Sequence, residues 1–378
     1  MIYADHAATT KISETAKLAM LSAMEKDWYN PSSLYTPGQQ ASGTLMDARV
    51  RIAHCLGCLP KEIYFTSGGS EADNQAILSA AAIGKRQGKM HIISTAFEHH
   101  AVLHTLKKLE KEGFEITLLD VGEKGIVSPV QVEKAIRPDT ILVTVMYANN
   151  EIGTIQPIRE IGAICRKNGV LFHTDAVQAA GHLQINVEKD QIDMLSLSAH
   201  KLNGPKGIGV LYAKTGVFLT NLIEGGGQER GKRAGTENLP AIVGMVAALE
   251  EACSLQKERS IYVTKLRDQL IDGLKKIPGA LLNGDATNRL PGNVNFCFPD
   301  TEAEGLLLLL DNKGICASSG SACTSGFLDP SHVLLAIGRD PQTARGSLRL
   351  TLDYENTPEE VETIIEAVTD TVRILRGC

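Results

Sequence analysis

The sequence predicts an α/β fold with a mainly parallel sheet. Short, nearly continuous apolar runs alternate with helical stretches along the first half of the chain, and parallel strands covered by helices on both faces produce this pattern. The 378 residues, of which 43% are hydrophobic, can bury a large core. The length also favours two domains, or one large domain with an appendage.

The first half of the chain supplies this alternation element by element. Ser13 is a suitable N-cap for the first helix, and Asn30-Pro31-Ser32-Ser33 predicts a turn before the second. No repeat or low-complexity tract interrupts the series. Apolar runs predict strands at residues 2–5, 63–66, 91–94, 115–119, 140–146 and 170–175. The stretches between them predict helices over residues 13–26, 40–56, 99–111, 129–136 and 158–168.

The second half begins with two further strands, expected at residues 194–197 and 207–212 and joined by a loop. Residues 225–238 are too rich in glycine and charge for a regular element, so we expect an ordered functional loop there. A long helix over residues 240–274 then leads to a second domain. That domain is expected to contain strands at residues 292–296, 314–317 and 346–352 and a closing helix at 358–375.

Charge and composition exclude several classes of function. The formal net charge is −6 and the basic residues are scattered, so we expect neither nucleic-acid binding nor binding to an anionic membrane. No leader-like segment opens the chain, and its longest leucine run, at residues 306–310, is too short to span a bilayer. We therefore expect small-molecule or protein partners and a cytoplasmic location.

The cysteines indicate a reducing compartment. Eight of them are spread thinly along the chain, without the density of a disulfide framework. Cys55 and Cys58 form a CxxC pair within an apparently helical segment, residues 48–59. Because no second pair of ligands lies nearby, we interpret them as core cysteines and expect no metal site.

A glycine turn between a strand and a helix is a candidate phosphate site. Ser67-Gly68-Gly69-Ser70 follows the strand at 63–66, and its glycines let the backbone pass close to a ligand. Ser70 can cap the following helix, whose first free N–H groups form an anion site. The same pattern also occurs in ordinary βα loops, and it is neither a Walker loop nor the dinucleotide fingerprint.

Three further residues indicate a cofactor at this edge of the sheet. Lys201 follows the strand at 194–197, on the C-terminal edge where open α/β sheets bind ligands. Asp175 ends a strand and His99 begins a helix. Pyridoxal phosphate needs an amine for its aldehyde, a carboxylate for its ring nitrogen and N–H donors for its phosphate. Taken singly, each residue has a structural alternative, such as a solvated lysine or a surface histidine at a helix start.

Several motifs occur in one order along the chain. The main ones are Asp175-Ala176-Val177-Gln178, Ser198-Ala199-His200-Lys201 and Gly320-Ser321-Ala322-Cys323-Thr324-Ser325-Gly326. They are accompanied by Asn30-Pro31-Ser32-Ser33, Asn149-Asn150-Glu151, Gln228-Glu229-Arg230-Gly231, Ala234-Gly235-Thr236-Glu237-Asn238 and Pro330-Ser331-His332-Val333. In these motifs the chain resembles cysteine desulfurases of the NifS/IscS type, over essentially its whole length.

The resemblance implies a fold with two domains. It is the PLP-dependent transferase fold type I, in which a mainly parallel seven-stranded sheet forms a large domain, here residues 14–250. Residues 1–13 and 251–378 would form a smaller α+β domain that carries the loop with Cys323.

The resemblance also implies a role for each cofactor-site residue. Lys201 would form a Schiff base with pyridoxal phosphate, Asp175 would pair with its ring nitrogen, and Gln178 would bond its phenolic oxygen. His99 would stack on the ring and help to move protons, since imidazole titrates near neutral pH. The residues that would hold the phosphate are Gly69, Ser70, Ser198, His200 and, from a second subunit, Thr236.

Four residues are implied on the substrate side. Arg349 resembles the family's clamp for the substrate carboxylate, because a guanidinium fork fits two oxygens. Asn30 would assist it, as would Asn150, which also borders the cofactor. Cys323 stands among small and polar residues and would be the nucleophile that takes the sulfur.

The implied function is that of a cysteine desulfurase, a sulfurtransferase that converts L-cysteine to L-alanine. The sulfur would leave as a persulfide on Cys323 for an iron–sulfur scaffold protein or another acceptor. The contribution of Thr236 across subunits implies a homodimer with shared active sites. Two alternatives stay open, namely a selenocysteine lyase of the same fold and a non-catalytic PLP-binding scaffold partner. Cys323 argues against an aminotransferase of this class.

Overall fold

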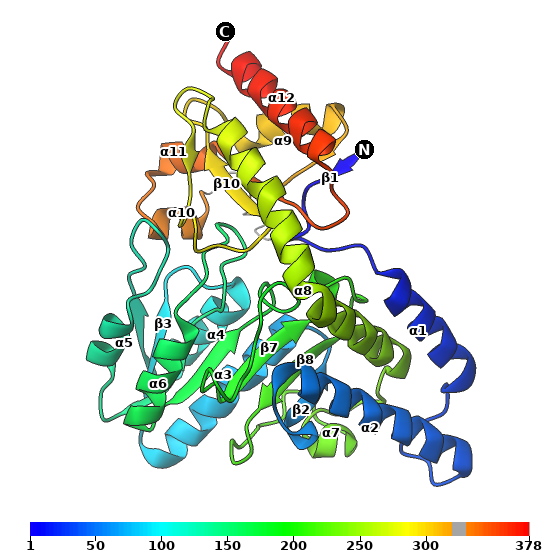
Figure 1. Ribbon diagram of the computed structural model, residues 1–378. Coiled ribbons are helices and arrows are strands. Elements are labelled where there is room, and N and C mark those ends of the chain that lie inside the picture. The colour runs from blue at the N-terminus through cyan, green and yellow to red at the C-terminus, as the bar shows by residue number, and fades with distance from the viewer. Residues whose placement is uncertain (320–329, 378) are drawn as a thin grey trace.

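The computed structural model of the protein describes residues 1–319 and 330–377. A seven-stranded sheet in the order β2-β8-β7-β6-β5-β3-β4 forms the body of the large domain (Figure 1). Neighbouring strands are parallel except for β8, which runs antiparallel to both β2 and β7, so the predicted mainly parallel sheet is confirmed. The strands are β2 (Ile63–Thr66), β3 (His91–Thr95), β4 (Glu115–Leu119), β5 (Thr140–Thr144), β6 (Leu171–Asp175), β7 (Met194–Ser198) and β8 (Gly209–Ala213).

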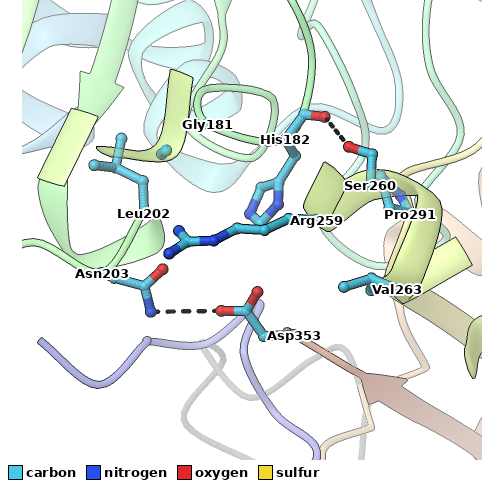
Figure 2. Close-up of a pocket in the computed structure, with 10 residues that line it drawn as sticks. Gly181, His182, Leu202, Asn203, Arg259, Ser260, Val263, Pro291 and Asp353 are labelled. Atoms are coloured by element: carbon cyan, nitrogen blue, oxygen red, sulfur yellow. Dashed lines mark hydrogen bonds between the residues drawn. The ribbon is translucent and has the colours of Figure 1, made fainter. Parts of the chain in front are cut away.

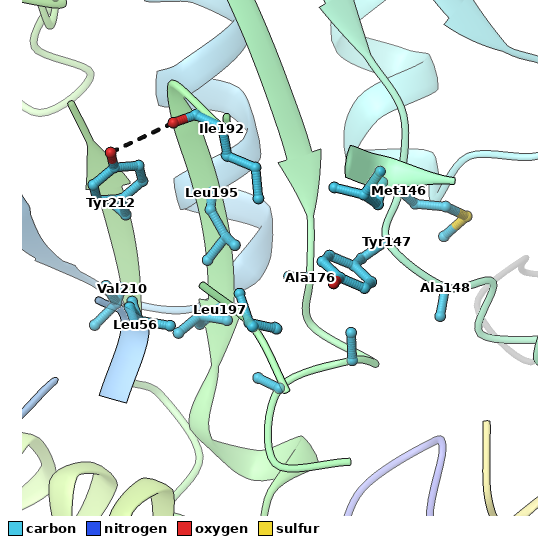
Figure 3. Close-up of a cluster of buried hydrophobic side chains, with 14 of the residues drawn as sticks. Leu56, Met146, Tyr147, Ala148, Ala176, Ile192, Leu195, Leu197, Val210 and Tyr212 are labelled. Atoms are coloured by element: carbon cyan, nitrogen blue, oxygen red, sulfur yellow. Dashed lines mark hydrogen bonds between the residues drawn. The ribbon is translucent and has the colours of Figure 1, made fainter. Parts of the chain in front are cut away.

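Helices cover both faces of this sheet because consecutive strand residues point to opposite sides. On β5, Leu142 packs in the cluster that α3 and α4 cover, whereas Val143 packs in the cluster on the other face with α2 and α6. Figure 3 shows part of this second cluster, with Leu195 and Val210 on neighbouring strands and Leu56 from α2. The first six helices of the chain are α1 (Glu14–Lys26), α2 (Thr36–Leu56), α3 (Gly69–Gln87), α4 (His100–Lys111), α5 (Pro129–Ala135) and α6 (Ile158–Asn168).

The long helix α8 (Leu239–Leu274) joins the large domain to a smaller one. Its first part, including Leu249, packs in the core of the large domain, and its last part, including Leu266, packs in a separate cluster. The small domain contains an antiparallel sheet in the order β12-β10-β9. Its elements after α8 are β9 (Leu281–Leu282), β10 (Asn293–Cys297), α9 (Ala303–Asn312), β11 (Ile315–Cys316), α10 (His332–Ala336), α11 (Pro341–Arg345), β12 (Ser347–Thr351) and α12 (Pro358–Leu375).

The first residues of the chain also pack in the small domain. Strand β1 (Ile2–Tyr3) pairs in parallel with β11, and Ala4 is buried in the small-domain cluster. Helix α8 passes from one hydrophobic cluster to the other, and the N-terminal strand packs with the second. Both observations support our proposal that the boundaries between the two domains lie at residues 13 and 250.

Polar contacts join α8 and the small domain to the large domain at their junction. A cavity of about 20 Å³ lies there, which is room for about one water molecule (Figure 2). Beside it, Ser260 of α8 donates to the carbonyl of His182 at 3.1 Å. Asn203 Nδ2 donates to the Asp353 carboxylate at 3.4 Å, which joins the large domain to the small one.

Within the described residues, α8 is also the one helix that is long and apolar enough to cross a bilayer. More than half of its apolar window, 56%, is buried inside the protein, as in the core helix of a globular domain. Length and composition alone are therefore weak evidence for a membrane segment.

The structure differs from the sequence-based expectation in four places. Helix α2 begins at Thr36 rather than near residue 40, because Pro37 fits the first turn of a helix. It ends at Leu56, where Gly57 is left-handed with φ 71°, so the half-buried Cys58 lies outside it. The expected loop at 225–238 contains one helical turn, α7 (Gln228–Gly231). The short elements β9, α9, α10 and α11 were not expected, since such segments carry little periodicity.

A buried ion pair orders the segment around α7. Glu229 and Arg230 have left-handed backbones, with φ 48° and 58°, which non-glycine residues rarely adopt. The Glu229 carboxylate accepts two hydrogen bonds from Arg49, at 2.6 and 2.7 Å, and a third from the backbone N–H of Phe65. Both side chains are almost fully buried, so the pair ties this segment to α2 and β2.

Replacing Glu229 by Ala should lower the free energy of unfolding by about 3–5 kcal/mol, because it leaves the Arg49 charge buried without its partner. Denaturant unfolding followed by circular dichroism measures this change. As a control, Glu133→Ala, which breaks the exposed pair with Lys167, should leave the free energy of unfolding nearly unchanged. Equal effects of the two substitutions would show that burial of the Arg49–Glu229 pair is unimportant.

Candidate active site

Lys201 lies where the sequence predicts, at the C-terminal edge of the central sheet. Strand β7 ends at Ser198 and passes into a single 3₁₀ turn over Ala199–Lys201. The Lys201 Nζ donates to the carbonyls of Ala7 and Ala8, at 2.6 and 2.7 Å. The N-terminal segment therefore crosses the sheet edge and holds the lysine side chain in place.

Gln178 shares one of these contacts. It follows β6, and its Nε2 donates to the carbonyl of Ala7 at 3.0 Å. The same carbonyl thus accepts from both Gln178 and Lys201, which brings the two predicted site residues together.

Asp175 ends β6, the strand next to β7, and is 6% exposed. Burial raises its pKa to about 6, against the opposing effects of the Val177 N–H, which donates to Oδ1 at 2.9 Å, and of the Lys201 charge. A carboxylate in this environment gains stability from a cationic partner, because that partner replaces the lost hydration.

A second buried acid lies beneath Asp175. Asp73 of α3 is 1% exposed, and burial followed by repulsion from Asp175 raises its pKa well above the usual value. Its Oδ1 is 3.6 Å from Nε2 of His173, which also contacts the Ser196 hydroxyl at 3.0 Å. Burial lowers the pKa of His173 to about 3, so this imidazole is neutral at neutral pH.

The glycine turn before α3 forms a close-fitting cradle. A Cβ at Gly69 would lie 2.6 Å from Val177 Cγ2, so only glycine fits there without movement. Ser198 lies beside the turn, with its Oγ 3.7 Å from a Cβ built at Gly68. The helix begins at Gly69 with Gly68 as N-cap, which corrects the expectation that Ser70 caps it. Ser70 is instead an exposed residue of the first turn, where backbone N–H groups point outward.

These features fit pyridoxal phosphate. An amine, a buried carboxylate and a helix N-terminus entered through a glycine cradle are the groups that its aldehyde, ring nitrogen and phosphate require. The chain's own residues thus provide a counterpart for each reactive part of the cofactor.

Two histidines border this arrangement. His99 is the N-cap of α4, and its Nδ1 accepts the N–H of Ala101 at 3.1 Å. Burial, and then the charges of Lys201 and His332, lower its pKa to about 4. His200 lies next to Lys201 and contacts Thr9 Oγ1 at 3.2 Å, and burial also lowers its pKa to about 4. Both imidazoles are therefore neutral near pH 7.

Arg349 reaches this region from β12 of the small domain. It is 3% exposed, and its Nη1 donates to the carbonyl of Asn150 at 3.1 Å. Its Nη2 donates to Asp5 Oδ1 at 2.8 Å, while its buried Nε has no hydrogen-bond partner among the described residues. A guanidinium with an unsatisfied donor can still bind a carboxylate.

Two predicted residues are not joined to this arrangement in the part of the chain that the structure describes. Asn30 is exposed in the turn before α2, where its Oδ1 accepts the N–H of Ser32. Thr236 is exposed in the segment before α8. Cys323 lies outside the described residues.

Sequence reasoning missed several residues of the site. The carbonyls of Ala7 and Ala8 hold Lys201, yet a backbone acceptor leaves no mark in residue identity. Asp73 follows the glycine turn by three residues, where the sequence shows only an acid near the start of a helix. Glu98 is also buried, and its carboxylate accepts hydrogen bonds from Thr95 Oγ1 and from the N–H of Met146. In the sequence, only its charge within an apolar stretch indicated a special role.

Comparison with known proteins shows the family to which the chain is similar. Residues 2–364 match the family model of aminotransferase class V. The cysteine desulfurase IscS of Methanosarcina thermophila is 52% identical over 376 residues, which cover 100% of this chain and 93% of that protein. A solved structure of a NifS-like protein has a TM-score of 0.92 at 36% identity and covers 99% of both chains. A structure of SspA in complex with cysteine has a TM-score of 0.82 at 36% identity, covering 94% of this chain and 100% of that one.

Replacing Asp175 by Asn should stabilise the cofactor-free protein in a pH-dependent way. Burial raises the pKa of Asp175 to about 6, above the unfolded value of about 3.9, so its charged form costs stability above pH 6. The cost disappears as the pH falls from 6 towards 4. The variant should exceed the wild type by roughly 1–3 kcal/mol at pH 8 and match it below pH 4. Denaturant unfolding across this range checks the expectation, and a wild type that is the more stable at pH 8 would contradict it.

Proposed function

The chain belongs to the class-V aminotransferase family and is a PLP-dependent cysteine desulfurase, and we propose that it takes sulfur from L-cysteine through Cys323. The observation that carries the assignment of residues is the convergence of Lys201, Asp175 and His99 at one edge of the sheet. The Lys201 charge opposes the effect of burial on the pKa of Asp175 and adds to it at His99, so Lys201 lies within electrostatic reach of both groups.

Bound pyridoxal phosphate withdraws electrons from the substrate's carbon skeleton and so weakens its bond to sulfur. Lys201 provides the amine that anchors the cofactor, and Asp175 provides a carboxylate for its ring nitrogen. The Gly69–Ser70 cradle, Ser198 and His200 are available for the phosphate. Gln178 donates to the carbonyl of Ala7, which Lys201 also contacts, and it would donate to the phenolic oxygen of the bound cofactor.

Proton transfer falls to Lys201 and His99. The His99 imidazole is neutral at working pH, because burial and the Lys201 charge lower its pKa to about 4. The Lys201 amine would carry the proton to and from the substrate carbon, and the neutral His99 imidazole would assist as a hydrogen-bond donor. The hydrogen bond from Ala101 N–H to His99 Nδ1 leaves Nε2 as the protonated nitrogen.

Arg349 is suited to bind the carboxylate of L-cysteine. Its Nε is a buried donor that lacks a partner among the described residues, and a substrate oxygen would satisfy it. The bond to the Asn150 carbonyl holds the guanidinium beside the cofactor site, and Asn150 and Asn30 complete the proposed substrate contacts.

The sulfur step belongs to Cys323. Its thiolate attacks the sulfur of L-cysteine, so an S–S bond forms as the C–S bond breaks, and the carbon that is left takes up a proton. The net change is one L-cysteine and one enzyme thiol to one L-alanine and one enzyme persulfide. The persulfide then passes its outer sulfur to an acceptor protein, for which an iron–sulfur scaffold is our proposal. A cytoplasmic location is part of this proposal, supported by the free cysteines among the described residues.

The active unit in this proposal is a homodimer with shared sites. Thr236, expected to reach a partner's phosphate site, is exposed in the segment before α8. Large apolar side chains are also exposed along α1, α2 and the segment between them, a feature of surfaces that associate. They are Leu18, Leu21, Met24, Trp28, Leu34, Tyr35, Met46 and Val50.

Replacing Cys323 by Ala should abolish the release of L-alanine from L-cysteine, by a factor of about 100 or more, while cofactor binding is unchanged. Alanine is measured by amino-acid analysis in the presence of a thiol reductant, and bound cofactor by its absorbance. Cys316→Ala is the matched control, since Cys316 is a half-buried free thiol on β11. Full alanine release by the Cys323 variant would exclude that residue as the nucleophile.

Replacing Met24 by Glu should shift the protein from dimer to monomer, because a charge would be buried in the proposed interface on α1. Analytical ultracentrifugation measures the mass. Leu308→Glu, at an equally exposed apolar residue on α9 of the small domain, should leave the dimer intact. A monomeric wild type, or dissociation caused only by the control, would refute the proposed interface.

A further inference from the structure

The segment after β5 forms a rigid turn beside His99. The Oδ1 atom of Asn149 accepts the backbone N–H groups of Glu151 and Ile152, at 2.8 and 3.0 Å. Its Nδ2 donates to the carbonyl of Phe97 at 3.0 Å. Asn149 is fully buried, so these bonds hold residues 149–152 and the segment that leads into His99 as one unit.

Glu151 connects this unit to the small domain through both its backbone and its side chain. Its carbonyl accepts Nδ2 of Asn293 and Nδ2 of Asn295, both on β10, at 3.2 and 3.1 Å. Its carboxylate accepts the hydroxyl of Ser331, the N-cap of α10, at 2.5 Å. One residue of the large domain thus binds two separate elements of the small domain.

Two further contacts between the domains flank Glu151. The carbonyl of Asn150, the preceding residue, accepts Nη1 of Arg349 at 3.1 Å. The carbonyl of Glu98, the residue before His99, contacts Nε2 of His332 at 2.9 Å. The groups that we assign to the substrate carboxylate and to proton transfer are therefore linked across the domain junction through residues 98 and 149–151.

Burial of the charged Glu151 carboxylate costs free energy. It is 3% exposed, and burial raises its pKa, against the opposing effects of the Ser331 hydroxyl and the charges of His332 and Arg349. Since no arginine or lysine hydrogen-bonds it among the described residues, its geometry depends on the Ser331 hydroxyl. An apolar side chain of similar size would fill the same space without this cost, but could not hold α10 in one orientation.

We propose that Glu151 is a positioning residue for substrate binding, which sets Arg349 of the small domain against the cofactor-side groups of the large domain. The inference rests on the proposed function, in which Arg349 binds the carboxylate of L-cysteine. Glu151 itself does not touch the substrate. Glu151 acts through the contacts that the residues on either side of Asn150 make. Loss of its side chain therefore changes how firmly Arg349 holds the carboxylate of L-cysteine.

Removing the Glu151 side chain should therefore separate substrate affinity from turnover. In the holoenzyme, Glu151→Ala should raise KM for L-cysteine about tenfold or more while kcat changes by less than about threefold, as expected when an interaction common to ground and transition states is lost. Glu151→Gln retains an oxygen that can accept from Ser331 and should restore KM to within about threefold of the wild type. Cofactor affinity should be unchanged in both variants.

A matched control separates this role from general stabilisation. Thr154 is fully buried three residues away, and its Oγ1 accepts the N–H of Asp285 in the small domain at 3.0 Å. Thr154→Val removes this contact between the domains without touching residues 149–151. It should leave KM unchanged even where it lowers the melting temperature.

Amide hydrogen exchange of the same holoenzymes provides a readout that does not depend on activity. Glu151→Ala should increase exchange in a peptide covering residues 330–338, whereas Thr154→Val should not. If Glu151→Ala does not fold, Ser331→Gly removes the same hydrogen bond at little cost to the helix cap and should give the same changes. A wild type that releases no alanine would overturn the proposed function, while exchange would still test the contact.

The inference is overturned if Glu151→Ala leaves both KM and the exchange of residues 330–338 unchanged. It is equally overturned if Thr154→Val raises KM as much as Glu151→Ala does, or if Glu151→Gln fails to restore KM. A tenfold rise in KM in the Ala variant alone, with recovery in Gln, supports it.

Discussion

The pairing of β6 with β7 is the constraint on which the site depends. These strands are parallel neighbours in which Asp175 is opposite Ser196, so the end of one presents a carboxylate where the other turns towards Lys201. Buried strands cannot slip by one residue without turning every apolar side chain to the wrong face. The core shown in Figure 3 therefore also fixes the position of the Lys201 amine relative to the Asp175 carboxylate along the strands.

Parts of the chain that are distant in sequence supply the other groups of the site. The N-terminal segment leaves the small domain at β1 and brings the carbonyls of Ala7 and Ala8 to Lys201. Strand β12 brings Arg349 from the other direction. The site therefore depends on both domains, and α8, together with the contacts of Glu151, determines how they meet.

Much of this could be predicted from the sequence, because buried strands and amphipathic helices leave periodic patterns and because the Lys201, Asp175 and glycine-turn motifs are local. The α/β class and the mainly parallel sheet were predicted for that reason. What could not be predicted depends on backbone atoms or on residues far apart in the chain. The carbonyls that hold Lys201 have no residue signature, and the pair of Arg49 with Glu229 joins positions 180 residues apart. In the sequence, Glu151 was only part of the Asn149-Asn150-Glu151 motif, because its partner Ser331 lies in the other domain.

The central claim is that Lys201 is the anchor of pyridoxal phosphate. Reduction of the purified holoenzyme with borohydride, followed by proteolysis and mass spectrometry, tests it most directly. The account predicts that the added mass of the reduced cofactor is found on the peptide that contains Lys201, with no other lysine modified to a comparable extent. Modification of a different lysine, or a protein that binds no cofactor after incubation with pyridoxal phosphate, would contradict it.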